Sequence, residues 1–182
     1  MRHAMRSWIR CLLPLLLLAA ATPPLLAQQS GDPLSDDEIE QIRENAIRPV
    51  ERLKLYMKFI DQRIDEIKQL SSDHRVTNRP AQLRSKFEEF TRLCDELQDN
   101  LDTYDSAHAD IRKALKDLVP DTVKWPDTLN LAGSDPAWDF ARKTALAAAQ
   151  SAGDEAKELQ TEQEKYFADH KDERNKNGNG PG

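Results

Sequence analysis

Apolar residues recur at alternating steps of four and three residues along one stretch of the chain, and this repeat dominates the sequence. The positions are Leu83, Phe87, Phe90, Cys94, Leu97, Leu101, Tyr104, His108, Ile111, Leu115 and Leu118. This spacing keeps one face of an α-helix turned toward a neighbouring helix along its whole length. No segment alternates apolar and polar residues with the period of a strand. We therefore predict an all-α protein.

The residues before this repeat predict a first long helix with a kink. Ser35 and Glu38 have the spacing of a capping box, so the helix is expected to begin there. Its apolar pattern shifts by one residue at Pro49, where proline removes a backbone donor and clashes with the preceding turn. The prediction is a helix over residues 35–72, kinked at Pro49.

The second and third helices are expected at residues 79–118 and 135–170. Residues 119–133 contain two prolines and are expected to form the connection between them. Alanines line the inward face of the third helix and can interdigitate with larger side chains of the second. These elements predict one domain, residues 35–170, folded as an up-down-up antiparallel bundle of three long helices.

The two ends of the chain are expected to lie outside that bundle. Three arginines precede an apolar run that ends at the small residue Ala27, which is typical of a signal peptide over residues 1–27. Residues 28–34 are expected to form a short leader. Residues 171–182 are rich in charge, asparagine and glycine and are expected to be a disordered tail. The protein is therefore expected to be exported, to a periplasm or to the extracellular space, without stable membrane insertion once the signal is removed.

Charge and cysteine content narrow the classes of partner. The chain carries a net charge of −6, which becomes −9 when the three signal arginines are removed. Such an acidic surface repels phosphate, so nucleic acid is not expected as a partner. Cys94 is the only cysteine after residue 27, so the exported chain has no internal disulfide, and its place in the repeat predicts a core residue.

The sequence shows no pattern that is typical of a catalytic or cofactor site. His-Glu-x-x-His, Cys-x-x-Cys-His and Gly-x-Ser-x-Gly are all absent. His108, with Asp105 before it, is expected to be a core histidine; the alternative is a metal or haem ligand. We expect no enzyme, no catalytic residue, no metal and no cofactor.

Four residues are candidates for contact with a partner. Leu55 and Phe59 fall on the side of the first helix opposite its inward face, with Tyr56 on their flank, and predict one apolar surface spot. Trp125 lies in the expected loop, where it could contact a partner or plug the end of the bundle near Ile39 and Ile42.

The main hypothesis is a non-enzymatic helical bundle that acts by protein–protein contact in the cell envelope, as a scaffold or by self-association. Its partner is another protein or a second copy of itself. One alternative is a periplasmic chaperone or carrier that holds apolar segments between helices hinged at Pro49 and Gly153. The other is a metal- or haem-binding bundle that uses His108.

Overall fold

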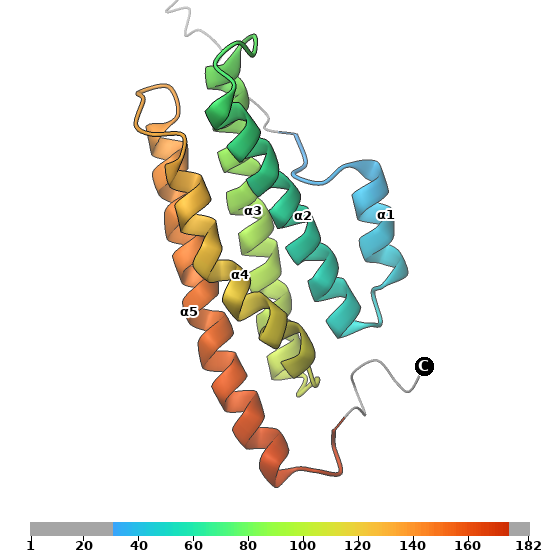
Figure 1. Ribbon diagram of the computed structural model, residues 1–182. Helices are drawn as coiled ribbons and strands as arrows, with labels where there is room; N and C mark the ends of the chain where they lie inside the picture. The colour runs from blue at the N-terminus through green and yellow to red at the C-terminus, as the bar shows by residue number, and fades with distance from the viewer. Residues whose placement is uncertain (1–30, 175–182) are drawn as a thin grey trace, which may run out of the picture.

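The computed structural model describes residues 31–174, which form helices joined by short turns and contain no strand (Figure 1). The helices are α1 (Asp36–Glu44), α2 (Pro49–Ser72), α3 (Arg79–Ser106), α4 (Arg112–Asn130) and α5 (Asp139–Asp169). The predicted all-α class is confirmed. The expected signal peptide, residues 28–30 and residues 175–182 lie outside the described part of the chain. Within residues 31–174, none of the helices has both the length and the apolar character needed to cross a membrane.

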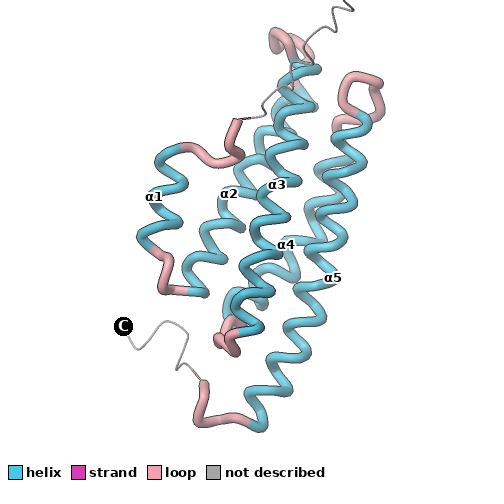
Figure 2. Tube along the Cα trace, turned by 180° about the vertical axis from the view of Figure 1, so that it is seen from behind, coloured by secondary structure: helices cyan, strands magenta, loops and turns pink. Residues whose placement is uncertain are grey.

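Four helices form the body of the molecule, and α1 lies outside them. Helices α2 and α5 each pack against both α3 and α4, so α3 and α4 occupy opposite corners of the bundle. Figure 1 shows α2 and α4 running upward while α3 and α5 run downward, and the view from behind in Figure 2 shows the same arrangement. The predicted bundle of three long helices is therefore wrong in number: the described residues form five helices, and four of them build the bundle.

The predicted helix 79–118 is interrupted after α3 by a turn at residues 107–111. His108 has a φ of 51°, in the left-handed region. The N–H of Ala109 donates to the Tyr104 carbonyl at 2.9 Å, and the N–H of His108 donates to the Asp105 carbonyl at 2.8 Å. These two bonds form a Schellman motif, the common C-terminal cap of a helix. The apolar repeat did not reveal the break because that motif normally carries glycine, and here it carries histidine.

Helix α4 includes most of the segment that the two prolines suggested was a loop. Pro120 and Pro126 both lie inside the helix. The apolar repeat continues through it, with Leu115, Leu118, Thr122, Trp125 and Leu129 buried. Packing of this face against α2 and α5 outweighs the cost of about 3 kcal/mol for an interior proline. The predicted loop over residues 119–133 is wrong for that reason.

The expected kink at Pro49 is instead a reversal of the chain. Residues 45–48 form a turn, after which α2 begins with Pro49 in its first helical position. Glu38 pairs with Arg63, and the Lys58 ammonium donates to Gln41, so α1 runs antiparallel to α2. The predicted capping box is confirmed, since Ser35 and Glu38 exchange side chain-to-backbone hydrogen bonds.

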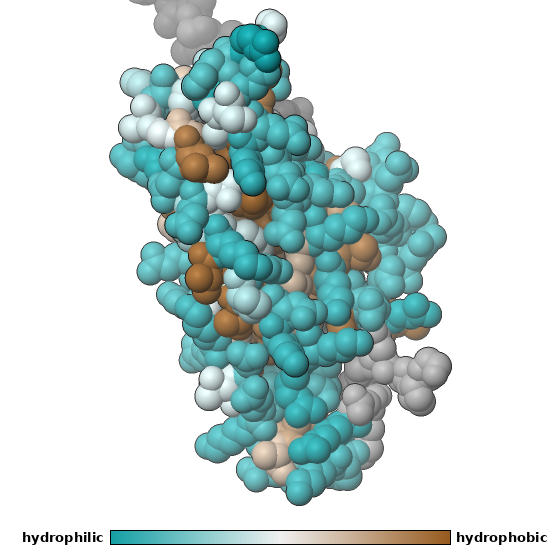
Figure 3. Space-filling model, viewed as in Figure 1, coloured by the Kyte–Doolittle hydropathy of each residue, from teal (hydrophilic) through white to brown (hydrophobic). Residues whose placement is uncertain are grey.

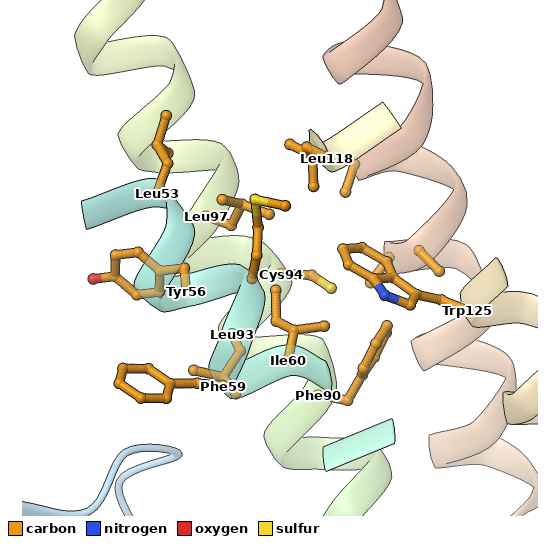
Figure 4. Close-up of a cluster of buried hydrophobic side chains, with 14 of the residues drawn as sticks. Leu53, Tyr56, Phe59, Ile60, Phe90, Leu93, Cys94, Leu97, Leu118 and Trp125 are labelled. Carbon is orange, nitrogen blue, oxygen red and sulfur yellow. The ribbon is translucent and has the colours of Figure 1, made fainter. Parts of the chain in front are cut away.

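The core lies between the four bundle helices, and Figure 4 shows its centre. Phe90 of α3 meets Trp125 of α4 edge to face, with ring centroids 5.7 Å apart. Cys94 is fully buried among apolar side chains, as its position in the repeat predicts, and burial raises the pKa of its thiol. Alanines on the inner face of α5 let its backbone lie close to α3 and α4.

The third predicted helix is confirmed over most of its length, with corrected ends. Helix α5 begins at Asp139 rather than residue 135, and the Ser134 hydroxyl donates to the Asp139 carboxylate at 3.1 Å. Residues 171–174, expected to be disordered, form a turn after the helix. The Arg174 guanidinium donates to the Phe167 carbonyl at 2.7 Å and fixes this turn against α5.

Candidate interaction surface

The predicted surface spot on α2 is covered by the N-terminal segment. Phe59 is 1% exposed, Tyr56 is also buried and Leu55 is half-buried. Arg63 lies one turn beyond Phe59 on the same helical face, and it binds Glu38 and the Pro33 carbonyl. The expectation of an exposed spot is wrong because α1 and the residues before it fold back over that face. The pattern showed that α2 has two apolar sides but not what covers the second.

A buried cluster of charges holds this covering segment in place. The Arg63 guanidinium binds both carboxylate oxygens of Glu38, at 3.0 and 2.9 Å, and donates to the Pro33 carbonyl at 2.6 Å. It also lies 3.0 Å from the carboxylate of Glu89 on α3. Burial acts to raise the pKa of Glu38, but the hydrogen bonds from Arg63 and Ser35 outweigh it and lower that pKa. Spacing along the chain gives no sign of this cluster, because its members are distant in the sequence.

Trp125 is a core residue and does not present a surface to a partner. Its ring is buried between α3 and α4, and its indole N–H donates to the Asp61 carboxylate on α2 at 3.1 Å. Burial is the main reason that the pKa of Asp61 is raised, with Asp121 and Asp65 adding to the effect. Trp125 therefore packs in the middle of the bundle rather than at its end, and neither expected role for it fits this position.

His108 lies at the surface, contrary to the expectation of a core histidine. Its ring stacks on Tyr166 with centroids 4.7 Å apart, and His170 stacks on the same tyrosine at 4.2 Å. The tyrosine hydroxyl donates to Glu173 at 2.7 Å. In residues 31–174, no three His, Cys, Asp or Glu side chains are grouped so that they could hold a metal ion.

Of the four large apolar side chains that are exposed in residues 31–174, three lie on α4, on α5 or in the turn between them, and the fourth, Ile47, lies between α1 and α2. Val123 is 62% exposed and lies beside a groove of about 360 Å³ between the two helices. We call this the α4–α5 groove; its lining residues are Thr122, Val123, Pro126, Leu146, Ala149, Gln150, Gly153, Asp154 and Lys157. Figure 3 shows apolar surface over these helices, and further apolar spots on the side of the molecule where α1 and α2 lie. Methyl and methylene groups dominate the lining, so the groove is suited to apolar side chains.

The shape of the groove depends on a close approach between α4 and α5. A Cβ placed on Gly153 would lie 3.1 Å from the Thr122 hydroxyl oxygen and 3.2 Å from its Cβ. The Thr122 hydroxyl is itself engaged, donating to the Val119 carbonyl at 2.9 Å. Glycine therefore marks a tight contact between two helices at this position.

The charged residues of the groove lie at one end of it. Asp154 and Lys157 are exposed, so they can pair with charges on a bound partner at its rim. Nearby on α5, burial raises the pKa of Glu155, and Asp102 and Asp99 reinforce the effect, while a 2.7 Å bond from Gln98 opposes it. Glu155 lies between α3 and α5 and does not line the groove.

Two more exposed apolar residues lie near the α4–α5 turn. Leu131 is 58% exposed, and Phe140, in the first turn of α5, is 85% exposed. Phe140 borders a smaller groove of about 220 Å³ that it shares with Glu88, Thr91 and Arg92 of α3. Continuing the apolar repeat beyond Leu118 would have identified this side of α4, because the repeat turns Thr122 and Trp125 inward and leaves Val123 outward.

Comparison of the chain with protein-family models, with curated proteins and with solved structures gives no match.

Proposed function

We propose that this protein is a non-enzymatic helical bundle of the cell envelope that binds an apolar face of a helix from another protein. The α4–α5 groove is the single observation that carries the proposal. Residues 1–27, with their basic start, apolar run and small residue at position 27, support export to a periplasm or to the extracellular space.

The groove favours binding over bond-making chemistry. The groove lies between α4 and α5 and is lined mostly by apolar groups, and many complexes bind a helix in an apolar groove. Val123 offers exposed apolar surface at its edge, and Asp154 and Lys157 supply one charge of each sign at one end. A partner helix with apolar residues three and four positions apart matches this lining.

The proposal is tested by capture of companion proteins from the envelope extract of the source cell. Purified wild-type protein is compared with Val123→Asp and with the matched control Leu131→Asp, since Leu131 is exposed to a similar extent. Both substitutions place a carboxylate at an exposed aliphatic position, so neither is expected to unfold the bundle. A carboxylate at Val123 would have to lose its water against an apolar helix and should abolish binding, whereas Leu131 does not line the groove.

A companion that is retained by the wild type and by Leu131→Asp, and lost from Val123→Asp, supports the proposal. Retention of the same companions by all three proteins contradicts it, as does the recovery of none.

A further inference from the structure

Helix α1 binds a surface that includes Phe59 and Arg63 of α2 and Glu89 of α3, which we call the seat of α1. We propose that this seat accepts the α1 helix of a second copy of this chain, so that two copies exchange this helix and form a symmetric dimer. The inference concerns a different surface from the α4–α5 groove and does not depend on the proposed function.

Helix α1 is attached to the bundle on one side. Figures 1 and 2 show it standing outside the four bundle helices, beside α2. Ile42 and the Glu38 side chain are buried against the bundle, while the remaining charged residues of α1 are exposed: Asp36, Asp37, Glu40, Arg43 and Glu44. A helix of nine residues is too short to persist alone, so α1 needs a seat to remain folded.

The seat also needs α1. Without it, Phe59 would be exposed to water and Arg63 would lose the bidentate partner that compensates its burial. An empty seat is therefore unfavourable on both counts. Ser35, Glu38 and Ile42, together with the Pro33 carbonyl, form the complement of this seat, and every copy of the chain carries that complement.

Opening the turn between α1 and α2 breaks few stabilising interactions. Its hydrogen bonds are local, from Asn45 to Ile42, from Ala46 to Arg43 and from Arg48 to Asn45. Residues 46–48 are exposed, so side-chain packing does not hold the turn closed. Four extended residues span about 13 Å, which allows α1 to reach a neighbouring copy when the starts of the two α2 helices meet. Exchange of an identical element through a short hinge is a low-cost route to a dimer.

Ile47 gives the exchanged form a contact that the single chain lacks. It lies in the turn and is 89% exposed. In a dimer with twofold symmetry the two opened turns run past each other, and the two Ile47 side chains meet at the axis. Their mutual burial favours the pairing of two copies over any arrangement in which one chain opens alone.

Charge reversal at the seat provides the test. Glu38→Arg places two guanidinium groups in the seat. Arg63→Glu replaces the Arg63 guanidinium with a carboxylate, beside those of Glu38 and Glu89. Neither variant can close its own seat or exchange with itself without repulsion. When the two variants are mixed, the helix that carries E38R fits the seat that carries R63E, and the unaltered helix fits the unaltered Arg63. The double variant E38R/R63E restores the pair within one chain and serves as the folding control.

The two single variants, one isotopically labelled, are unfolded together in urea, refolded and measured by native mass spectrometry and far-UV circular dichroism. We expect a folded 1:1 heterodimer in about tenfold or greater excess over either homodimer, because like charges in one seat are strongly disfavoured. Val123→Asp in both chains should leave this yield unchanged, and Ile47→Asp should lower it. Co-refolding that returns only separate chains, folded or unfolded, while the double variant folds, overturns the proposal.

Discussion

The side chain of Gln163 on α5 binds the backbone of Ile111, at the break between α3 and α4. Its Oε1 accepts the Ile111 N–H at 3.1 Å, and its Nε2 donates to the Ala109 carbonyl at 3.1 Å. Gln163 is buried, so these bonds replace water for two backbone groups that the turn leaves without helical partners. One amide from a distant helix thus satisfies the turn that separates the two hairpins of the bundle.

Replacing Gln163 by leucine should destabilise the protein by about 2–4 kcal/mol, since each buried backbone group left without a partner costs about 1–3 kcal/mol. Leucine has a similar volume, which separates the loss of hydrogen bonds from the loss of packing. Urea unfolding followed by circular dichroism measures the change. Gln160→Leu, one turn earlier on α5 and half-buried, is the matched control and should change stability by less than about 0.5 kcal/mol. Equal effects of the two substitutions would show that the bridge to Ile111 contributes nothing.

His108 occupies a left-handed position that suits glycine better than any residue with a Cβ. His108→Gly should therefore be more stable than His108→Ala by about 1 kcal/mol. Both variants lack the imidazole, so the loss of stacking on Tyr166 cancels in this comparison. Thermal unfolding of the two proteins side by side measures the difference. An alanine variant as stable as the glycine variant would mean that the turn relaxes out of the left-handed region.

Gly153 and Thr122 should show coupled effects on stability. Alanine in place of glycine favours a helix by about 1 kcal/mol, but here its Cβ would press on the Thr122 side chain. Gly153→Ala should thus be markedly more favourable when Thr122 is replaced by glycine, which removes both the hydroxyl oxygen and the Cβ that crowd this position. Urea unfolding of the wild type, both single variants and the double variant gives the interaction energy. Additive effects would indicate that α4 and α5 move apart without cost at this point.

Acid should weaken the attachment of α1 through Glu38. The pKa of Glu38 is lower in the folded protein than its ordinary value of 4.5, so its contribution is complete above pH 4.5. The contribution is then lost as the pH falls through the folded-state pKa. Glu38→Gln should cost about 2 kcal/mol near neutral pH, because a charge-assisted bond to Arg63 becomes a neutral one.

The wild type and Glu38→Gln should therefore become more similar in stability as the pH is lowered. The raised pKa values of Asp61, Asp95, Glu96 and Glu155 act in the opposite direction, but they are common to both proteins and cancel in the difference. Urea unfolding between pH 7 and about pH 3 measures the gap between them. A gap that stays constant over this range would rule out ionisation of Glu38 as its origin.

Much of the helical structure could be predicted from the chain because the signals are local. The capping box at Ser35 and Glu38 and the burial of Cys94 both follow from spacing along one helix. The candidate surface was predicted less well. Leu55, Tyr56 and Phe59 have the pattern of a second apolar face, but periodicity gives no information on which segment covers a face.

What the sequence determined by itself is which residues need burial and where most helices run. The tertiary structure alone decided that α3 stops at Ser106, that Pro120 and Pro126 lie inside a helix, and that α1 folds back on α2. In each case contacts between distant residues outweighed a local preference. Gln163 satisfies the break after α3, the core around Trp125 offsets two prolines, and Arg63 fixes a helix too short to form alone. Such contacts have no periodic signature, because their members are brought together only when the chain has folded.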